Sequence, residues 1–280
     1  MTVHHLDCAC MCPFGGRLLL GSGGLLTGRM VGHCLLVESE QGLILVDTGL
    51  GTGDLADPRR LGRTFHAAAR PRLTPERTAL HQVRALGHRA EDVRHIVLTH
   101  LDVDHAGGLG DFPQAQVHVL AEELRAARAR ATRGERDRYR PAQWAHGPRW
   151  VEHTVDGDSW FGFQAVRPPV PALADLLLVP LPGHTRGHSA VAVRQGERWL
   201  LHCGDAYFSH REVRPTGADC PPGLRAFQRL VATDNRTRLA NQERLRELRR
   251  EHGDEVRLLC AHDPADFDRL RVEQATTAAN

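Results

Sequence analysis

The stretch THLDVDHAGGLG (residues 99–110) follows directly on the apolar run VRHIVLT (93–99). Four side chains able to bind a metal ion lie close together in it: His100, Asp102, Asp104 and His105. A short apolar, β-branched run that feeds into such a loop is typical of a buried strand. The sequence therefore predicts a functional loop at the carboxyl end of a strand.

The composition is that of a globular protein. The 280 residues, 41% of them hydrophobic, are enough to bury a sizeable core, so we expect a single domain over residues 1–280. Its core is expected between about residues 30 and 265. Acidic and basic residues almost balance at a formal net charge of +2, which gives no reason to expect a nucleic acid or a membrane as partner. The expected partner is a small-molecule substrate.

All 36 basic residues are arginine, which excludes chemistry that needs a Schiff-base or phosphate-binding lysine. No apolar stretch is long enough to span a bilayer, and the start MTVHHLDCACMC lacks the features of an export signal. We therefore expect a cytoplasmic protein. The heavy use of Ala, Arg, Gly and Pro points to a bacterial source.

The seven cysteines form an odd set without the rhythm of a disulfide framework, so we expect them as thiols in a reducing compartment. Cys8, Cys10 and Cys12 are spaced C-x-C-x-C, whereas zinc sites typically use C-x-x-C. We favour structural or surface thiols over a separate metal site here.

Strand and helix patterns alternate along the chain. Apolar runs predict strands, hairpins or strands with a following loop at 32–39, 42–49, 93–99, 115–120, 176–188, 189–206 and 256–263. Helical spacing predicts helices at 74–88, with Thr74 as N-cap, at 121–140 and at 236–253. This alternation predicts a layered α/β architecture built from two similar halves.

Three later strands also end at residues that can bind metal: His184 in PGHTRGH, Asp205 in HCGDAYF and His262 in CAHDP. Sheets of α/β proteins gather site groups at the carboxyl ends of their strands, so we expect these residues to meet the loop 99–110. One histidine alone would more often be a core or surface residue. The shared position at strand ends is what predicts a site.

Together these motifs resemble the signature of the metallo-β-lactamase superfamily. The matching residues are VDTG (46–49), HLDVDH (100–105), GHTRGH (183–188), GD (204–205) and His262. The resemblance runs from about Gly32 to His262. It implies an αββα sandwich of two mixed β-sheets flanked by helices, with a dinuclear metal site at one edge of the sheets.

The resemblance also implies a ligand set. One metal ion would be held by His100, Asp102 and His184, the second by Asp104, His105 and His262, and Asp205 would bridge them. Asp47 would orient ligands through hydrogen bonds without binding metal. Imidazole and carboxylate ligands suit zinc, iron and manganese. We expect two divalent ions, zinc before iron or manganese.

Position 102 departs from the superfamily pattern, because most members have histidine there. A carboxylate makes the first site harder and more negative, which tilts its preference towards iron or manganese. The iron-containing flavodiiron branch has glutamate at this place, so a carboxylate is compatible with a dinuclear centre. Asp102 is therefore expected as a direct ligand, and a role in orienting other ligands is the alternative.

The leading functional hypothesis is a metal-dependent hydrolase, closest in layout to the N-acyl homoserine lactonase-like branch. A hydroxide bridging the two metal ions would attack the carbonyl of a lactone, ester or thioester, and Asp104 would pass a proton to the leaving group. Those lactonases have a tyrosine three residues after the bridging Asp. Here that position is Phe208, so Tyr207 is the candidate oxyanion donor. Di-iron oxygen or peroxide chemistry, phosphodiester hydrolysis and a noncatalytic binding role are the alternatives.

Two stretches bear on the substrate. The arginine-rich segment 125–140 would favour an anionic substrate if it folded over the site, but a solvated helix is the favoured interpretation. Five aromatic residues could line an acyl pocket or form a satellite core: Trp144, Trp150, Trp160, Phe161 and Phe163.

Overall fold

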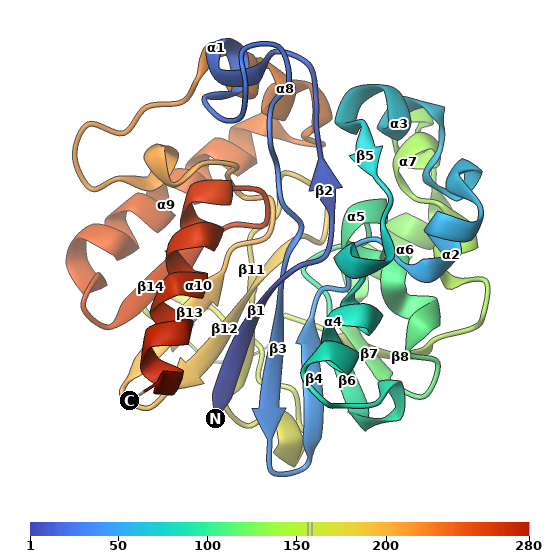
Figure 1. Cartoon of the computed structure of the whole chain (residues 1–280). Helices are drawn as coiled ribbons and strands as arrows, with labels where there is room; N and C mark the ends of the chain where they lie inside the picture. Colours follow the sequence, from blue (N-terminus) through green and yellow to red (C-terminus); the bar gives the residue numbers. More distant parts are fainter. Residues whose placement is uncertain (156, 158, 280) are drawn as a thin grey trace.

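Two β-sheets lie face to face and helices cover their outer faces (Figure 1). The computed structural model describes residues 1–155, 157 and 159–279. This arrangement is the αββα sandwich that the sequence predicts. Within the described residues, no helix is long and apolar enough to cross a membrane.

The first sheet has six strands in the order β1-β3-β4-β6-β7-β8. They are β1 (Thr2–Asp7), β3 (His33–Ser39), β4 (Gly42–Val46), β6 (Val93–Val97), β7 (Gln116–Leu120) and β8 (Arg149–His153). β1, β3 and β4 pair antiparallel, whereas β4, β6, β7 and β8 run parallel. The sheet is therefore mixed, and the carboxyl ends of β4 and β6 lie at one edge.

The second sheet has four strands in the order β11-β12-β13-β14. They are β11 (Leu176–Pro180), β12 (Ser189–Gln195), β13 (Arg198–His202) and β14 (Val256–Leu259). β13 and β14 are parallel, so their exits also share an edge. Two small sheets pair β2 (Cys10–Met11) with β5 (Pro71–Arg72) and β9 (Ser159–Trp160) with β10 (Phe163–Gln164).

Side chains alternate along each strand between two apolar layers, as expected for sheets buried on both faces. Leu35 of β3 belongs to the layer between the sheets, together with Leu178 and Val191 from the second sheet. Leu36, its neighbour, packs in the layer that includes Val83 of helix α4 (Ala79–Ala85). This alternation buries both faces of the first sheet.

Helices complete the outer layers. α4 and α6 (Ala121–Ala129) contribute apolar side chains to the core outside the first sheet, and α9 (Asn235–His252) does so outside the second. The other α-helices described are α1 (Gly16–Leu20), α2 (Thr52–Ala56), α3 (Arg63–Ala69), α5 (Val103–Ala106), α7 (Arg133–Arg138), α8 (Pro222–Val231) and α10 (Pro264–Ala279). Short 3-10 helices span Pro58–Leu61, Pro75–Arg77, Ala90–Asp92, Gly107–Asp111, Pro141–Trp144, Pro171–Leu173 and His210–Val213.

Three details differ from the sequence-based prediction. The helix expected from Thr74 begins later, because the hydroxyl of Thr78 accepts a hydrogen bond from the His81 N–H and caps α4. The helix expected over 121–140 is broken at Arg130, whose φ of 44° ends α6 in a left-handed conformation. The N-terminal strand β1, which pairs with β3, was not predicted.

Candidate metal centre

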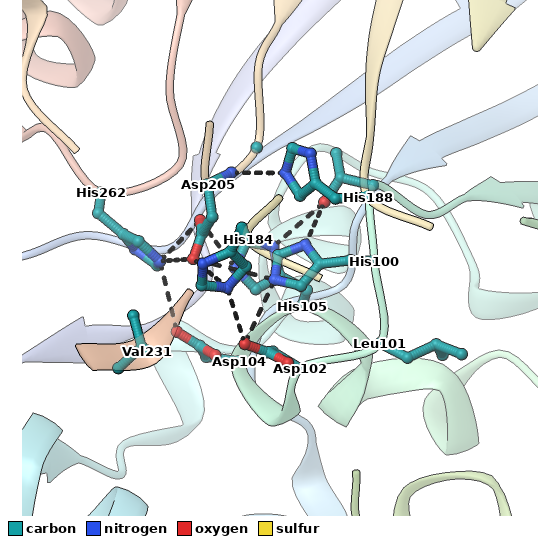
Figure 2. A network of polar contacts seen from close by, with 12 residues as sticks. His100, Leu101, Asp102, Asp104, His105, His184, His188, Asp205, Val231 and His262 are labelled. Atoms are coloured by element: carbon teal, nitrogen blue, oxygen red, sulfur yellow. Dashed lines mark hydrogen bonds and ion pairs between the residues drawn. The ribbon is translucent and has the colours of Figure 1, made fainter. Parts of the chain in front are cut away.

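Five strand exits bring the predicted side chains to one edge of the two sheets. Asp47 follows β4, and the loop 99–105 follows β6. From the second sheet, His184 follows β11, Asp205 follows β13 and His262 follows β14. Figure 2 shows the histidines and aspartates from these loops turned towards one another. The parallel pairs β4–β6 and β13–β14 explain why these loops lie close together, because parallel strands end at a common edge of the sheet.

Two groups of ligand atoms converge there. One comprises His100, Asp102, His184 and Asp205, and the other Asp104, His105 and His262; within each group the ligand atoms lie within 4.8 Å of one another. Asp205 lies between the groups. One of its oxygens, Oδ2, is 3.4 Å from His184 Nε2, and the other, Oδ1, is 3.3 Å from His105 Nε2 and 3.1 Å from His262 Nε2. This carboxylate is placed to contact cations on both sides.

Unsatisfied polar atoms indicate that the cluster fits metal ions. The Nε2 atoms of His100 and His105 and the Oδ1 atoms of Asp102 and Asp205 are buried and make no hydrogen bond. Buried polar atoms are normally paired, since leaving one unpaired costs about 1–3 kcal/mol. Four such atoms, all of types that coordinate divalent cations, make this cluster a suitable donor set for two of them.

Outer hydrogen bonds fix the orientation of the imidazoles. His105 Nδ1 donates to Asp47 Oδ2 at 2.8 Å, and His262 Nδ1 donates to the Val31 carbonyl at 2.8 Å. His100 Nδ1 donates to Thr99 Oγ1 at 2.9 Å, while the Thr99 hydroxyl donates to Asp47. The Nδ1 atoms of these three histidines are thus engaged, which leaves their Nε2 lone pairs facing the cluster.

Asp47 takes the predicted position behind the cluster. Both its oxygens accept hydrogen bonds, from Thr99 and from His105. Burial alone would raise the pKa of Asp47, but the neighbouring imidazoles outweigh it and hold that pKa below its usual value. Asp47 therefore remains an anion that orients His105.

Asp102 lies beside a cation that the sequence did not single out. Arg138 Nη1 is 3.2 Å from Asp102 Oδ2 and donates to the His184 carbonyl at 3.3 Å. Its Nη2 donates to the Val231 carbonyl. Burial would raise the pKa of Asp102, but Arg138 and the imidazole of His100 lower it well below the usual range. Asp102 Oδ2 also lies 3.1 Å from His184 Nε2, so the carboxylate faces the first ligand group.

The arginine-rich segment divides its residues between surface and site. Arg125 pairs with Glu122 and Arg128 with Glu152 at the surface, which agrees with the solvated helix that we favoured. Arg138 differs, since its side chain is only 13% exposed and reaches the cluster. No local pattern marks it, because Asp102 lies 36 positions earlier in the chain.

His188 is a second residue whose role the sequence did not assign. Its Nε2 accepts a hydrogen bond from the Asp205 N–H at 2.9 Å, and its Nδ1 donates to the Leu181 carbonyl at 3.0 Å. It therefore fixes the backbone that carries Asp205. The signal available in the sequence was its position in the motif GHTRGH, four residues after His184.

A cavity of about 890 Å³ opens above the cluster. Asp102, Asp104, His184, Asp205 and His262 contribute to its lining. The other lining residues are mainly apolar and include Leu20, Met30, Phe65, Phe208, Phe227 and Val231. The cavity therefore combines a polar floor with walls suited to an apolar group.

Tyr207 does not reach this cavity. It is fully buried in the apolar layer that also contains Leu245 and Cys203, and its hydroxyl makes no hydrogen bond. Burial raises the pKa of Tyr207 well above its usual value. The neighbouring Phe208 lines the cavity instead, so the structure does not bring Tyr207 to the position that an oxyanion donor needs.

The five aromatic residues after the arginine-rich segment belong to cores. Trp160 and Phe163 are buried in the layer outside the second sheet, with Phe161 packed against it. Trp144 and Trp150 pack against the layer outside the first sheet. None of the five lines the cavity. They therefore form part of the apolar core and do not make an acyl pocket.

The N-terminal cysteines remain thiols. Cys8 is buried, and Cys10 and Cys12 are partly exposed. Among the residues whose side chains are described, neither group of potential metal ligands includes a cysteine.

Comparison with known proteins places the chain in a family. The model of the metallo-beta-lactamase superfamily matches residues 27–252. The "Probable metallo-hydrolase Rv2300c" of Mycobacterium tuberculosis is 47% identical over 264 residues, which cover 94% of this chain and 81% of that protein. The N-acyl homoserine lactonase AiiA of Bacillus thuringiensis subsp. kurstaki is 34% identical over 203 residues, 70% of this chain and 74% of that protein.

Solved structures agree on the fold. The B. thuringiensis AiiA structure with N-decanoyl-L-homoserine bound at its active site superposes with a TM-score of 0.68 at 20% identity, covering 95% of both chains. The family match, the relatives and the strand-end cluster agree with one another. The chain is therefore a metal-dependent hydrolase that belongs to the metallo-β-lactamase superfamily.

Proposed function

We propose that the protein hydrolyses the carbonyl group of a lactone, ester or thioester with two divalent cations, zinc first among them. The observation that carries this proposal is the position of Asp205, whose carboxylate contacts both groups of ligand atoms. Its Oδ2 lies 3.4 Å from His184 Nε2 and 3.2 Å from His262 Nε2, and its Oδ1 lies 3.1 Å from His262 Nε2. A carboxylate between two imidazole and carboxylate sets is the arrangement that a two-metal centre requires.

The residues divide between the two positions. His100, Asp102 and His184 would hold one cation; Asp104, His105 and His262 would hold the other; and Asp205 would contact both. Cations bound there would supply Lewis acidity, which acidifies water and polarises a carbonyl oxygen. The imidazoles are held for this task by the hydrogen bonds of Asp47, Thr99 and the Val31 carbonyl.

Asp104 is the candidate for proton transfer. Its carboxyl lines the cavity and its Oδ2 lies 3.6 Å from His262 Nε2. A carboxylate at the cavity floor can accept a proton from the attacking water and give it to the departing alkoxide or thiolate, which leaves as an alcohol or a thiol. Tyr207 is not given a part in this scheme, because it lies in the core.

The apolar walls of the cavity support an acyl substrate. Phe65, Phe208 and Phe227 line the space above the polar floor. The relatives agree with this chemistry, since AiiA is an N-acyl homoserine lactonase and the solved structure of an AiiA mutant has N-decanoyl-L-homoserine bound at its active site.

Arg138 weakens the argument for a di-iron centre. The carboxylate of Asp102 makes the first ligand group more negative than three imidazoles would, which favours iron. The guanidinium 3.2 Å away offsets that charge, so the pair together has the net charge of a neutral imidazole. Zinc therefore stays first in the proposal.

The test is a panel of lactones, esters, thioesters and phosphodiesters, run with the purified chain loaded in turn with zinc, manganese and iron. We expect two metal ions per chain by elemental mass spectrometry and hydrolysis of carbonyl substrates. Asp205→Asn should lower kcat/KM by at least about a hundredfold, whereas Asp254→Asn, at an exposed turn, should not change it. Phosphodiester hydrolysis alone, or two irons with oxygen consumption, would overturn the proposal.

A further inference from the structure

Exposed apolar side chains gather at the mouth of the cavity. Of the large hydrophobic residues exposed in the described part of the chain, six come from the segment 14–26 and from α8: Phe14 (68% exposed), Leu18 (75%), Leu19 (51%), Leu25 (73%), Leu26 (79%) and Leu230 (83%). Figure 1 shows α1 and α8 side by side at one end of the molecule. We call this set the apolar rim. Single exposed leucines are ordinary, but a contiguous group of this kind marks an interaction surface.

The rim is continuous with the cavity. Phe14, Leu19 and Leu230 also line the cavity, and Leu19 packs closely on the start of α8. A Cβ at Gly223 would come within 2.6 Å of the Leu19 Cβ, so the two segments touch without room for a larger residue. Leu18, Leu25 and Leu26 lie outside the cavity lining. The rim therefore extends the apolar cavity walls onto the outer surface.

The charged residues within the two rim segments are all basic, and Asp219, directly before the second segment, is paired with Arg211. Residues 12–30 and 220–232 contain four arginines and no aspartate or glutamate. Arg29 is paired with Asp268, and the exposed Arg17, Arg225 and Arg229 lie in the same two segments as the rim. The net charge of +2 for the whole chain led us to expect no membrane partner. That value averages over all residues and so hides the local excess of arginine in these two segments.

We propose that the apolar rim docks on the surface of an anionic phospholipid bilayer. The leucine and phenylalanine side chains would enter the acyl region at the headgroup boundary, and the arginines would contact the lipid phosphates. The attachment is peripheral, in keeping with the lack of a spanning helix among the described residues. It would bring the cavity mouth to the membrane, where an apolar acyl substrate is concentrated.

Charge favours a bilayer over a second copy of the chain. A two-fold contact through the rim would place the patch against its own copy, so Arg17, Arg225 and Arg229 would face a partner surface that is also basic. Like charges facing each other oppose such a contact, whereas anionic headgroups attract all three.

The test is co-sedimentation of the full chain with vesicles of phosphatidylcholine alone or mixed with phosphatidylglycerol. We expect binding to the anionic vesicles that weakens as salt is added. Replacing three rim residues together, Leu18→Ser, Leu25→Ser and Leu26→Ser, should lower the partition coefficient at least about tenfold, because the apolar surface that would leave water on docking is lost. Arg17→Gln with Arg229→Gln should lower binding to anionic vesicles only.

A matched control carries Leu239→Ser and Val272→Ser, which are exposed on α9 and α10 away from the rim, and should bind as the wild type does. Circular dichroism confirms that each variant is folded. Hydrolysis of a short, water-soluble ester should be the same in rim variants and wild type, so failure of membrane docking is separable from failure of the proposed function. Absence of binding to anionic vesicles, or equal binding by the rim variant, would refute the inference. Sedimentation equilibrium that shows a dimer abolished by the rim substitutions would assign the surface to a second copy instead.

Discussion

Arg138 decides how Asp102 presents its carboxylate. The guanidinium is anchored on two backbone carbonyls, of His184 and Val231, and reaches Asp102 at 3.2 Å. Groups that orient a metal ligand typically contribute about 10- to 100-fold to metal affinity. Arg138→Gln should therefore weaken binding of the first zinc by about that factor, measured by competition with a chromophoric chelator. Arg138→Lys should recover part of the lost zinc affinity. Arg136→Gln, on the exposed side of α7, should leave the zinc affinity unchanged. Equal affinities in Arg138→Gln and wild type would leave Asp102 independent of Arg138.

Tyr207 allows a sharp test of the site assignment. Removal of an oxyanion donor lowers kcat by about 100- to 1,000-fold. Since Tyr207 is buried outside the cavity, Tyr207→Phe should leave kcat/KM for an ester within about twofold of wild type. Its thermal stability should be unchanged or higher, because the hydroxyl has no hydrogen-bond partner to lose. A hundredfold fall in kcat would mean that the cavity rearranges on binding substrate.

At the scale of elements, α6 ties together the loops that carry the ligands. The buried carboxylate of Glu123 accepts hydrogen bonds from the Leu101 N–H at 3.0 Å and from the Gly187 N–H at 3.1 Å. Glu123→Ala would release both loops and leave three buried donors unpaired: the Leu101 and Gly187 N–H groups and the Tyr139 hydroxyl, which donates to Glu123 at 3.1 Å. We expect the free energy of unfolding to fall by about 2–4 kcal/mol, measured by urea denaturation. Glu122→Ala, one residue earlier and exposed, should change it by no more than about 0.5 kcal/mol.

Three adjacent strands carry a chain of histidines that predicts a pH effect. His118 on β7 lies 3.0 Å from His95 on β6 and 3.0 Å from His153 on β8. Burial, with smaller contributions from His153 and His95, lowers the pKa of His118 from 6.5 to about 3. The unfolded chain therefore takes up a proton below pH 6.5 that the folded chain does not. The stabilisation from neutral His118 is complete above pH 6.5 and is lost progressively as the pH falls towards 3.

The comparison of wild type with His118→Gln isolates this contribution. Wild type should lose up to about 1.4 kcal/mol per pH unit more than the variant below pH 6.5, by urea denaturation at a series of pH values. Parallel pH profiles for the two proteins would show that His118 titrates normally in the folded chain.

The same scale shows what the sequence could predict. The strand ends were predictable, because apolar runs stop at His and Asp, and parallel pairing then brings those ends together. Arg138, Glu123 and His188 were not assigned, since each acts through a contact made only after folding. Tyr207 was misplaced because the loop after β13 buries its side chain in the core, and it is Phe208 that lines the cavity. The break at Arg130 separates α6 from α7, the helix whose last residue is Arg138.

For the whole molecule, the cluster is the place where the two sheets are joined by polar groups. His100, Asp102, Asp104 and His105 come from the first sheet, whereas His184, Asp205 and His262 come from the second. Cations bound across this boundary stabilise only the folded chain, in which the ligands are assembled. Removal of metal should therefore lower the melting temperature of the entire domain in one transition.

We expect chelation by a strong chelator to lower the free energy of unfolding by about 4 kcal/mol, relative to free zinc at a thousand times its Kd. Calorimetry should show a drop of several degrees in Tm, and zinc should restore it where magnesium does not, because imidazole-rich sites prefer zinc. In Asp205→Asn the difference between metal-free and zinc-loaded protein should shrink, since that residue contacts both ligand groups. A Tm that is the same with and without zinc would show that the assembled side chains hold no cation, and the two sheets would then be joined by apolar packing alone.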